Sequence, residues 1–386
     1  MVSKRNKRRI LHPYAMNSPV RWFEALRLYG GVSAGNLDKA LLATVSSLMT
    51  TPLRMAEHAL FKRRIDSTSI SRPPLFILGH WRTGTTFLHS LLTQDHEAGY
   101  VTLFQTLAPE SFFVGQKTLQ PLAAMRAPRT RPMDNVLLEM EGPQEEEFAV
   151  AHSSGHSFYV GWYFPRAMER LFDKYALLEG LSRDELAAWQ RSYIHMLKVA
   201  TRHAGGRRLV IKNPVNTCRI DALLELFPDA KFVHICRDPY AVYMSTLHLF
   251  RSVLNLVSLQ KIDDAEIERY VLKFYRQMTE RYLKDRDRIP AGNLVEVRYE
   301  DLDANPVAET ERIYAELSLP GWEEAREDVC AYAQSQRNYA KNLFIMSPSD
   351  VLKVEEHWKI GLDAWGYLRP ESATEIQPYV GAPAVS

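Results

Sequence analysis

A glycine-rich turn, Gly79–Thr86 (GHWRTGTT), constrains the fold of this chain more than any other feature. The residues before it, Leu75–Leu78, form a short continuous apolar run, which is typical of a strand buried on both faces. The residues after it, Thr85–Leu92, place apolar side chains on one helical face. A strand, a glycine turn and a helix in this order direct backbone N–H groups and a helix N-terminus at an anion. The sequence therefore predicts a phosphate-binding loop.

Three further apolar runs indicate strands at Leu209–Ile211, Phe232–Cys236 and Leu294–Arg298. Helical patterns fill the gaps, notably around residues 265–288 and 307–317. Strands that alternate with helices form mostly parallel sheets covered on both faces. We therefore expect an α/β fold: a P-loop-like, mostly parallel sheet that is flanked by helices.

The chain divides into three parts by pattern. Residues 1–70 combine a loose basic tail, over residues 1–16, with amphipathic helices. Residues 71–370 form the main domain, in which residues 95–205 are a large helical and aromatic insertion between the first two strands. Ligands of open α/β sheets bind at the carboxyl ends of the strands, so we expect this insertion to form the wall of an acceptor pocket. Residues 371–386 are a C-terminal tail, and the polar and aromatic stretch 337–367 is a candidate lid.

Residues 21–62 contain large apolar side chains at helical spacing. Among them are Leu37, Leu41, Val45 and Leu48. One interpretation is that these helices pack on the domain through this apolar stripe, and this is what we expect. The other is peripheral contact with a membrane surface, which Trp22 and the basic cluster 62–64 favour.

Composition excludes several classes of protein. The net charge of +2 argues against a nucleic-acid binder. The three cysteines have no metal-ligand spacing, so we expect no metal site, and such sparse usage suits a reducing compartment. The chain contains no apolar run of about 18 residues and no secretory signal pattern, which together predict a cytoplasmic protein.

The loop differs from that of a kinase or nucleotide triphosphatase. Those enzymes require Lys directly after the last glycine of the loop, where this chain has Thr85. The positive charge lies earlier, at Arg82, which suits one terminal group on a 5′-phosphate better than a triphosphate with magnesium. A P-loop kinase or triphosphatase stays as the alternative enzyme, and a non-catalytic nucleotide-binding protein of the same fold as the alternative from another class.

A second anion site is predicted at the end of the strand Phe232–Cys236. Arg237 follows this strand directly, and Ser245 lies eight residues later on the next helix. A guanidinium and a hydroxyl can clamp a phosphate. Alternatively, the arginine pairs with a carboxylate and the serine bonds to its own helix. Two anion sites at neighbouring strand ends would suit a nucleotide phosphorylated at both its 3′ and 5′ positions.

These motifs, with Arg298–Leu302 (RYEDL) after the last strand, resemble the sulfotransferases that use 3′-phosphoadenosine-5′-phosphosulfate (PAPS). The stretches 73–92, 143–148 and 209–249 resemble the bacterial-type sulfotransferase family in particular. The resemblance covers roughly residues 70–370. It implies transfer of a sulfuryl group from PAPS, without a metal, to a hydroxyl or similar nucleophile of a small-molecule, lipid or carbohydrate acceptor.

The resemblance also implies roles for individual residues. Arg82 and Lys212 would contact the transferring group and stabilise the charge that develops on the bridging oxygen. Arg237 and Ser245 would hold the 3′-phosphate, and Tyr299 would contact the adenine. The residues that would hold the 5′-phosphate are Thr83, Gly84, Thr85 and Thr86.

The general base is left open by the sequence. Cytosolic animal members have a histidine two residues after the lysine that matches Lys212, where this chain has Pro214. Our candidates are Glu145 and Glu147, which would point about 160° apart on a helix with 3.6 residues per turn. A carboxylate among apolar residues can act as a base, although an acidic first turn can also simply complement the helix dipole. His152 is a further candidate.

Overall fold

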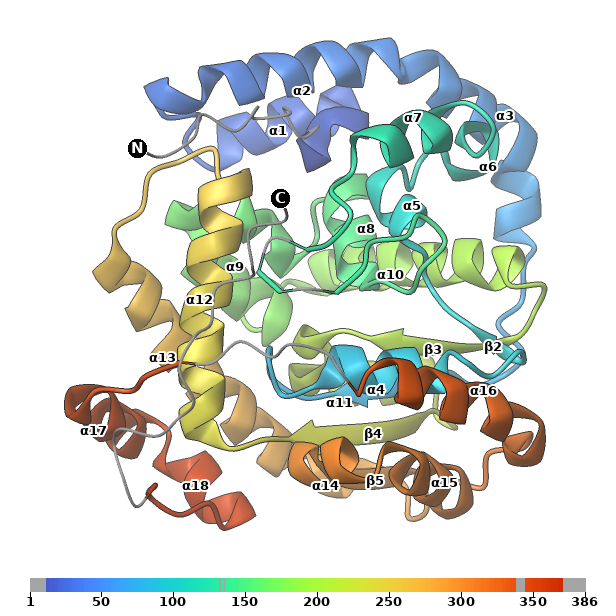
Figure 1. The fold of residues 1–386 in the computed structure, drawn as a ribbon. Coiled ribbons are helices and arrows are strands. Elements are labelled where there is room, and N and C mark those ends of the chain that lie inside the picture. Colours follow the sequence, from blue (N-terminus) through green and yellow to red (C-terminus); the bar gives the residue numbers. More distant parts are fainter. Residues whose placement is uncertain (1–11, 132, 135, 338–343, 371–386) are drawn as a thin grey trace, which may run out of the picture.

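Five parallel strands form the centre of the computed structural model, which describes residues 12–131, 133–134, 136–337 and 344–370 (Figure 1). Their order across the sheet is β2-β3-β1-β4-β5. The strands are β1 (Leu75–Leu78), β2 (Ala98–Gly99), β3 (Arg208–Lys212), β4 (Lys231–Cys236) and β5 (Leu294–Arg298). In the central register Ile77 lies opposite Lys212 on one side and Val233 on the other. The predicted α/β fold with a parallel sheet is confirmed.

The helices are named here in chain order. The first nine are α1 (Pro19–Leu28), α2 (Leu37–Met49), α3 (Thr51–Asp66), α4 (Thr85–Leu92), α5 (Leu103–Leu107), α6 (Phe112–Gly115), α7 (Leu119–Arg126), α8 (Glu146–Ser153) and α9 (Met168–Leu171). The others are α10 (Arg183–His203), α11 (Ile220–Leu226), α12 (Pro239–Val257), α13 (Asp264–Asp285), α14 (Tyr299–Ala304), α15 (Pro306–Glu316), α16 (Trp322–Ser335), α17 (Pro348–His357) and α18 (Lys359–Trp365). Within the described ranges, none of these helices is both long and apolar enough to cross a membrane.

Side chains of β1 alternate between two buried layers, because successive residues of a strand point to opposite faces. Leu75 and Ile77 pack in one cluster with apolar side chains of α4, α15 and α16. Phe76 and Leu78 pack in the other, which contains the insertion and α13. All four residues of β1 are buried. The strand is therefore rigidly held, and it fixes the loop that follows it.

Along the chain, a large helical insertion separates the first two strands from the last three. It contains α5 to α10 and lies between β2 and β3. The sequence analysis missed β2, because this edge strand is only two residues long and has no apolar run. The insertion therefore follows the second strand rather than the first, and Figure 1 shows its helices stacked above one end of the sheet.

The segment before α1 is not a loose tail up to residue 16, as the sequence suggested. Pro13–Met16 forms a 3-10 helix, and Tyr14 is buried among aromatic side chains. The imidazole Nε2 of His12 lies 2.9 Å from the carbonyl oxygen of Val257, on α12. Residues 1–11 and the predicted tail 371–386 lie outside the described residues. The expectation failed because a short anchor of this kind leaves no periodic signal.

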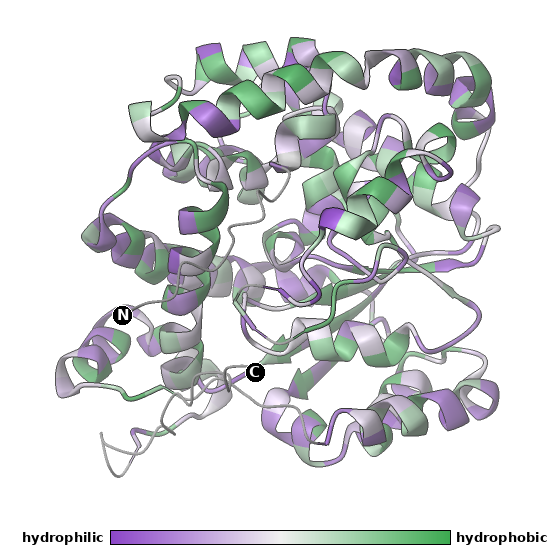
Figure 2. Ribbon diagram, turned by 45° about the horizontal axis from the view of Figure 1, so that its top comes forward, coloured by the Kyte–Doolittle hydropathy of each residue, from purple (hydrophilic) through white to green (hydrophobic). Residues whose placement is uncertain are grey.

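The prediction that the N-terminal helices pack on the protein through their large apolar side chains is wrong. In α2 the small residues face the protein, and they are Ala40, Ala43 and Ser47. The large apolar residues of the stripe face outward: Leu41 is 66% exposed, and Leu37, Val45 and Leu48 are exposed as well. Figure 2 shows hydrophobic stretches recurring along these outer helices. Periodicity located the stripe correctly but did not indicate which way it faces.

A substitution at Gly84 tests whether the loop needs a glycine there. Gly84 has a φ of +98°, and an added Cβ would lie 2.3 Å from Cδ2 of Tyr299. We expect Gly84→Ala to lower the free energy of unfolding by more than the roughly 1 kcal/mol that a left-handed alanine costs, measured by urea denaturation. Gly155→Ala is the matched control, because Gly155 has a φ of +76° but no neighbour within 4 Å. Equal losses in the two variants would contradict a steric role.

Candidate active site

Two features of the loop between β1 and α4 concern its backbone: the uncapped start of α4 and the unusual conformation of Arg82. Gly84 is the N-cap residue of α4, and no side chain caps this helix terminus. The first N–H groups of a helix have no partner within the helix, so they are available to an anion here. Arg82 has a φ of +71°, which is uncommon for a residue with a side chain and marks local strain. Both features fit the predicted phosphate loop.

Thr83 closes the loop on itself. Its backbone N–H and its hydroxyl Oγ1 both donate to the carbonyl oxygen of His80, at 3.3 and 2.8 Å. The Thr83 side chain is buried and does not line the cavity described below. Any contribution of Thr83 to phosphate binding would therefore act through the shape of the loop.

The Arg82 guanidinium bonds to Ser245 and Asp134, which come from distant parts of the chain. Its Nε donates to Oγ of Ser245 on α12, at 2.8 Å, and its Nη1 donates to Oδ2 of Asp134, at 2.8 Å. Asp134 also accepts from Arg131. Burial opposes the charge of Asp134, but the two guanidiniums outweigh it and hold the pKa of this carboxyl at about 2. Asp134 therefore occupies the position beside the Arg82 guanidinium in which an anionic ligand would bind.

Arg237 and Tyr299 lie together at the ends of β4 and β5. The Arg237 guanidinium lies over the Tyr299 ring, 4.1 Å from its centroid, and its Nη1 donates to the carbonyl oxygen of Arg82 at 3.1 Å. The hydrogen bond from Arg237 to the carbonyl oxygen of Arg82 therefore links the second predicted anion site to the backbone of the phosphate loop. A guanidinium stacked on a flat ring beside a phosphate loop is suited to a phosphorylated nucleoside.

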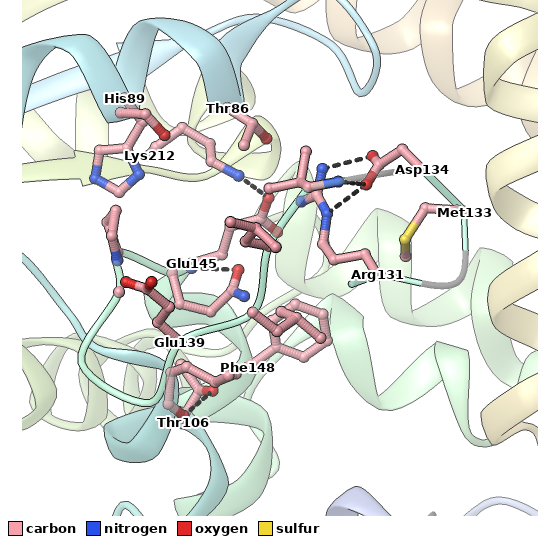
Figure 3. A pocket seen from close by; sticks show the side chains of 18 of the residues that line it. Thr86, His89, Thr106, Arg131, Met133, Asp134, Glu139, Glu145, Phe148 and Lys212 are labelled. Atoms are coloured by element: carbon pink, nitrogen blue, oxygen red, sulfur yellow. Dashed lines mark hydrogen bonds and ion pairs between the residues drawn. The ribbon is translucent and has the colours of Figure 1, made fainter. Parts of the chain in front are cut away.

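Lys212 and Glu145 form a buried contact at the end of β3 (Figure 3). Lys212 Nζ donates to Oε1 of Glu145, and the hydroxyl of Tyr159 donates to its Oε2. Burial lowers the pKa of Lys212, while the charge of Glu145 acts in the opposite direction. The nearby indole Nε1 of Trp81 donates to the Tyr159 oxygen at 3.2 Å. Glu145 is therefore held on both of its oxygens, and it faces the cavity.

The next two glutamates have different surroundings. Glu147 is fully buried and pairs with Arg219 through two hydrogen bonds of 2.6 and 2.9 Å. Glu146 accepts from Tyr193, Asn213 and Asn216, and burial raises its pKa to about 7. Neither residue lines the cavity. Of the two carboxylates that we predicted as bases, the structure brings only Glu145 to the phosphate loop.

His152 is committed on both ring nitrogens. Its Nδ1 lies 2.6 Å from the carbonyl oxygen of Thr106, and its Nε2 lies 2.7 Å from the hydroxyl of Tyr163. Since a carbonyl only accepts, Nδ1 must donate and Nε2 must accept from the tyrosine. Burial lowers the pKa of His152 to about 4. His152 lines the cavity, but neither nitrogen is free to accept a proton from an acceptor in this arrangement.

One cavity of about 1010 Å³ brings most of the predicted residues together. The predicted residues that line it are Arg82, Gly84, Thr85, Thr86, Glu145, Lys212, Arg237 and Tyr299. Thr83, Glu147 and Ser245 are outside its lining, although Ser245 is one hydrogen bond away through Arg82. The described part of the candidate lid, residue 337 and residues 344–367, contributes no lining residue. Instead, its Trp358 is buried against α13, with the indole N–H donating to the carbonyl oxygen of Leu272 at 3.0 Å.

Comparison with known proteins now decides the family. Residues 73–324 match the model of the sulfotransferase family. The chain belongs to the sulfotransferase family. It is 34% identical over 350 residues to the omega-hydroxy-beta-dihydromenaquinone-9 sulfotransferase Stf3 of Mycobacterium bovis and to that of Mycobacterium tuberculosis, covering 89% of this chain and 88% of each relative.

Solved structures support the fold. The sulfotransferase STF9 of Mycobacterium avium aligns with a TM-score of 0.65 at 20% identity, covering 90% of this chain and 96% of that one. STF1 of Mycobacterium tuberculosis aligns with a TM-score of 0.60 at 19% identity, covering 83% and 86%. The family match and the 34% identical relatives identify the chain as an enzyme that transfers sulfuryl groups, as its motifs suggested.

Several cavity residues of this sulfotransferase were missed in the sequence. They are Arg131, Asp134, Glu139 and Tyr159. Asp134 and Glu139 lie in a stretch without helical or strand periodicity, so no pattern pointed to them. Tyr159 was noted only as one of several aromatic residues of the insertion. Its role as the second partner of Glu145 depends on a contact across 14 residues of chain.

Glu147 gives a direct test of a structural role for the second glutamate. Glu147→Gln would leave the Arg219 guanidinium, whose side chain is fully buried, without its counter-charge. Breaking one side of a buried pair costs about 3–5 kcal/mol, so we expect a loss of this size in the free energy of unfolding, measured by urea denaturation. Glu139→Gln, at an exposed carboxylate, is the control and should change stability by less than about 0.5 kcal/mol. If both variants unfold at the same urea concentration, the Glu147–Arg219 pair has no structural role.

Proposed function

We propose that this sulfotransferase transfers a sulfuryl group from PAPS to a hydroxyl on a lipid-like acceptor, with Glu145 as the general base. One observation carries the proposal: the side chains of Arg82, Lys212 and Glu145 all reach the same cavity beside the phosphate loop. Two cations and one carboxylate are the groups that an in-line displacement at sulfur requires. The cations stabilise the leaving oxygen, and the carboxylate takes the acceptor proton.

The donor would bind along the carboxyl edge of the sheet. The free N–H groups at the start of α4, with Thr85 and Thr86, would hold its 5′-phosphate. Arg237 would hold the 3′-phosphate, and Tyr299 would contact the adenine. Ser245 now accepts from Arg82, so a contact between its hydroxyl and the 3′-phosphate requires Arg82 to turn away from it. The donor supplies an anion that can replace Asp134 as a partner of Arg82.

The transfer step conserves all atoms and charges. The acceptor oxygen forms a bond to sulfur while the bond from sulfur to the bridging phosphate oxygen breaks. The acceptor proton moves to Glu145, and the negative charge moves to the 5′-phosphate of the departing adenosine 3′,5′-bisphosphate. Lys212 lies between these two events, because its ammonium now pairs with Glu145 and could follow the charge to the leaving oxygen. No metal is required by this scheme.

The acceptor side of the cavity favours a lipid-like molecule. Its lining includes Phe148, Trp162, Leu107, Met140 and Val253. Apolar side chains in the lining of such a cavity suit an apolar ligand that carries a single reacting hydroxyl. The curated relatives are named for a menaquinone derivative with an omega-hydroxyl group, which is an acceptor of this chemical kind.

Donor binding is tested by a thermal-shift titration with adenosine 3′,5′-bisphosphate. At about a hundred times its dissociation constant the ligand should add roughly 2.7 kcal/mol of stability, which appears as a rise of a few degrees in Tm. Arg237→Ala should reduce this shift strongly, because it removes the guanidinium proposed to hold the 3′-phosphate.

Arg251→Ala is the matched control for the titration. Arg251 lies on α12 and pairs with Asp264, away from the cavity. Its variant should show the full shift. AMP and Mg-ATP serve as further ligands, and a shift with Mg-ATP alone would replace this proposal by a phosphotransferase. An unchanged shift in Arg237→Ala would remove Arg237 from the donor site.

The role of Glu145 is tested by Glu145→Gln. The amide keeps the size of the side chain but cannot accept a proton, so we expect kcat to fall by about 10²–10⁴. The assay measures sulfuryl transfer from PAPS to a long-chain alcohol. The bisphosphate-induced shift in Tm shows in the same sample that the donor site is folded.

Glu139→Gln is the comparison for this variant. Glu139 lines the same cavity, but its side chain is exposed. Its variant should retain a kcat within a few-fold of the unchanged enzyme. Glu145→Asp keeps a carboxylate and should recover part of the lost rate. A Glu145→Gln enzyme with ordinary turnover would show that the base lies elsewhere.

A further inference from the structure

The second helix of the chain is built with its larger apolar side chains on the outside. Its inward residues are alanine and serine, as described above, and its outward residues include Leu37, Leu41, Val45, Leu48 and Met49. Met49 is 75% exposed. Single exposed apolar residues are ordinary, but a contiguous row along a helix marks an interaction surface.

The third helix, α3, also has large apolar side chains on its outer face. Two of its three buried residues are charged: Arg54 donates to the carbonyl oxygens of Met16 and Ser47, and Glu57 accepts from the backbone N–H groups of Phe113 and Val114. Its outward residues include Met55 and Leu60, which are 68% and 62% exposed. The helix is therefore held to the protein partly by polar contacts, while several of its apolar side chains stay in solvent.

This apolar surface continues towards the mouth of the cavity. The ring of Phe61 on α3 stacks on Phe113 of α6, at 4.9 Å between centroids, and three residues separate α6 from α7. On α7, Met125 is 67% exposed, while Ala123 lines the cavity. Leu137 also lines the cavity and is 69% exposed, so it lies at an opening. The helices α1, α2, α3 and α7 lie at one end of the molecule (Figure 1).

Basic residues are also enriched in the N-terminal part of the sequence. Residues 1–66 contain twelve Lys and Arg against four Asp and Glu, a net charge of +8, whereas the whole chain has +2. The remaining residues therefore carry a net charge of −6. Arg27, Arg63 and Arg64 are exposed on α1 and α3. Basic side chains around an apolar surface are complementary to anionic lipid headgroups.

We propose that α1, α2 and α3 form a docking surface for an anionic lipid bilayer, with their outward apolar side chains inserted among the headgroups. We call these side chains the apolar N-terminal face: Phe23, Leu37, Leu41, Val45, Leu48 and Met55. Docking through this face would bring the opening near Leu137 to the membrane surface. An acceptor with an apolar chain could then enter the cavity directly from the bilayer.

A second copy of the chain is the competing occupant of this face. The charge of residues 12–66 opposes it: seven Lys and Arg against four Asp and Glu give a net charge of +3, and a two-fold interface would place two such basic segments against each other. A bilayer instead supplies the opposite charge and an apolar interior together. The continuity of the face with the cavity opening also favours a bilayer. The docking inference uses no property of the donor site, and only the entry route of the acceptor depends on the proposed function.

Vesicle flotation with the purified full chain tests the inference. The probe is large unilamellar vesicles of equal parts phosphatidylcholine and phosphatidylglycerol, beside vesicles of phosphatidylcholine alone. We expect the protein to float with the anionic vesicles and to bind less at high salt, since salt screens the charge attraction. The variant Leu41→Ser/Val45→Ser/Leu48→Ser should lower the partition coefficient about tenfold or more, because three apolar side chains no longer insert.

The matched control changes three exposed apolar residues elsewhere. Ile345→Ser/Leu352→Ser/Leu368→Ser removes similar side chains from the C-terminal part of the chain and should float like the unchanged protein. The bisphosphate-induced rise in Tm shows that each variant is folded, and it is independent of lipid. No flotation with anionic vesicles, or equal flotation of the Leu41 variant, would overturn the inference. A dimer that the Leu41 variant dissociates, without flotation, would assign the face to a second copy.

Discussion

The buried contact between Lys212 and Glu145 is the interaction on which the arrangement of the site depends. Lys212 is the last residue of β3, and Glu145 is the residue before α8, 67 positions earlier in the chain. Two charges removed from water are stable only when each has a partner. Their pairing therefore fixes the start of α8 against the carboxyl end of β3. Because the phosphate loop follows the neighbouring strand β1, the same contact sets the position of the carboxylate relative to Arg82 and the donor site.

Three glutamates in a row have three different surroundings, and helix geometry explains how. Glu145 is the N-cap residue, with extended backbone angles, and Glu146 and Glu147 are the first two helical residues. Successive helical residues turn by about 100° around the axis. One side chain therefore meets the cavity, one meets Tyr193 and the asparagines after β3, and one meets Arg219. The two fully buried glutamates hold α8 in place, so that the first can be exposed to the cavity on a rigid support. The base proposed at Glu145 would therefore depend on two neighbours that do not line the cavity.

Local features of this chain could be predicted from its sequence, and contacts between distant segments could not. The strand at Leu75–Leu78 and the helix at Thr85–Leu92 were predicted residue for residue, because apolar runs, glycines and helical spacing act over a few positions. Asp134 was missed, because its significance comes from Arg82, 52 positions away. The bond from Arg82 to Ser245 was missed for the same reason. For α2 the period was right and the direction wrong: a stripe of leucines normally faces the core, but here alanine and serine allow the helix to lie close against the protein with the leucines outside.

The two ends of the cavity suit two different kinds of molecule. At one end Arg237, Tyr299 and the start of α4 offer a cation, a flat ring and free N–H groups, which suit a charged nucleotide arriving from water. At the other end Leu137 and α7 would offer an apolar rim, near helices that carry exposed apolar and basic side chains. If the donor and a lipid-like acceptor entered through one opening, they would have to pass each other. Separate openings would let the donor enter from water and the acceptor enter from the membrane. Arg82, Lys212 and Glu145 line the same cavity, so under the two proposals the donor would reach them from the phosphate loop and the acceptor from the side of the apolar N-terminal face.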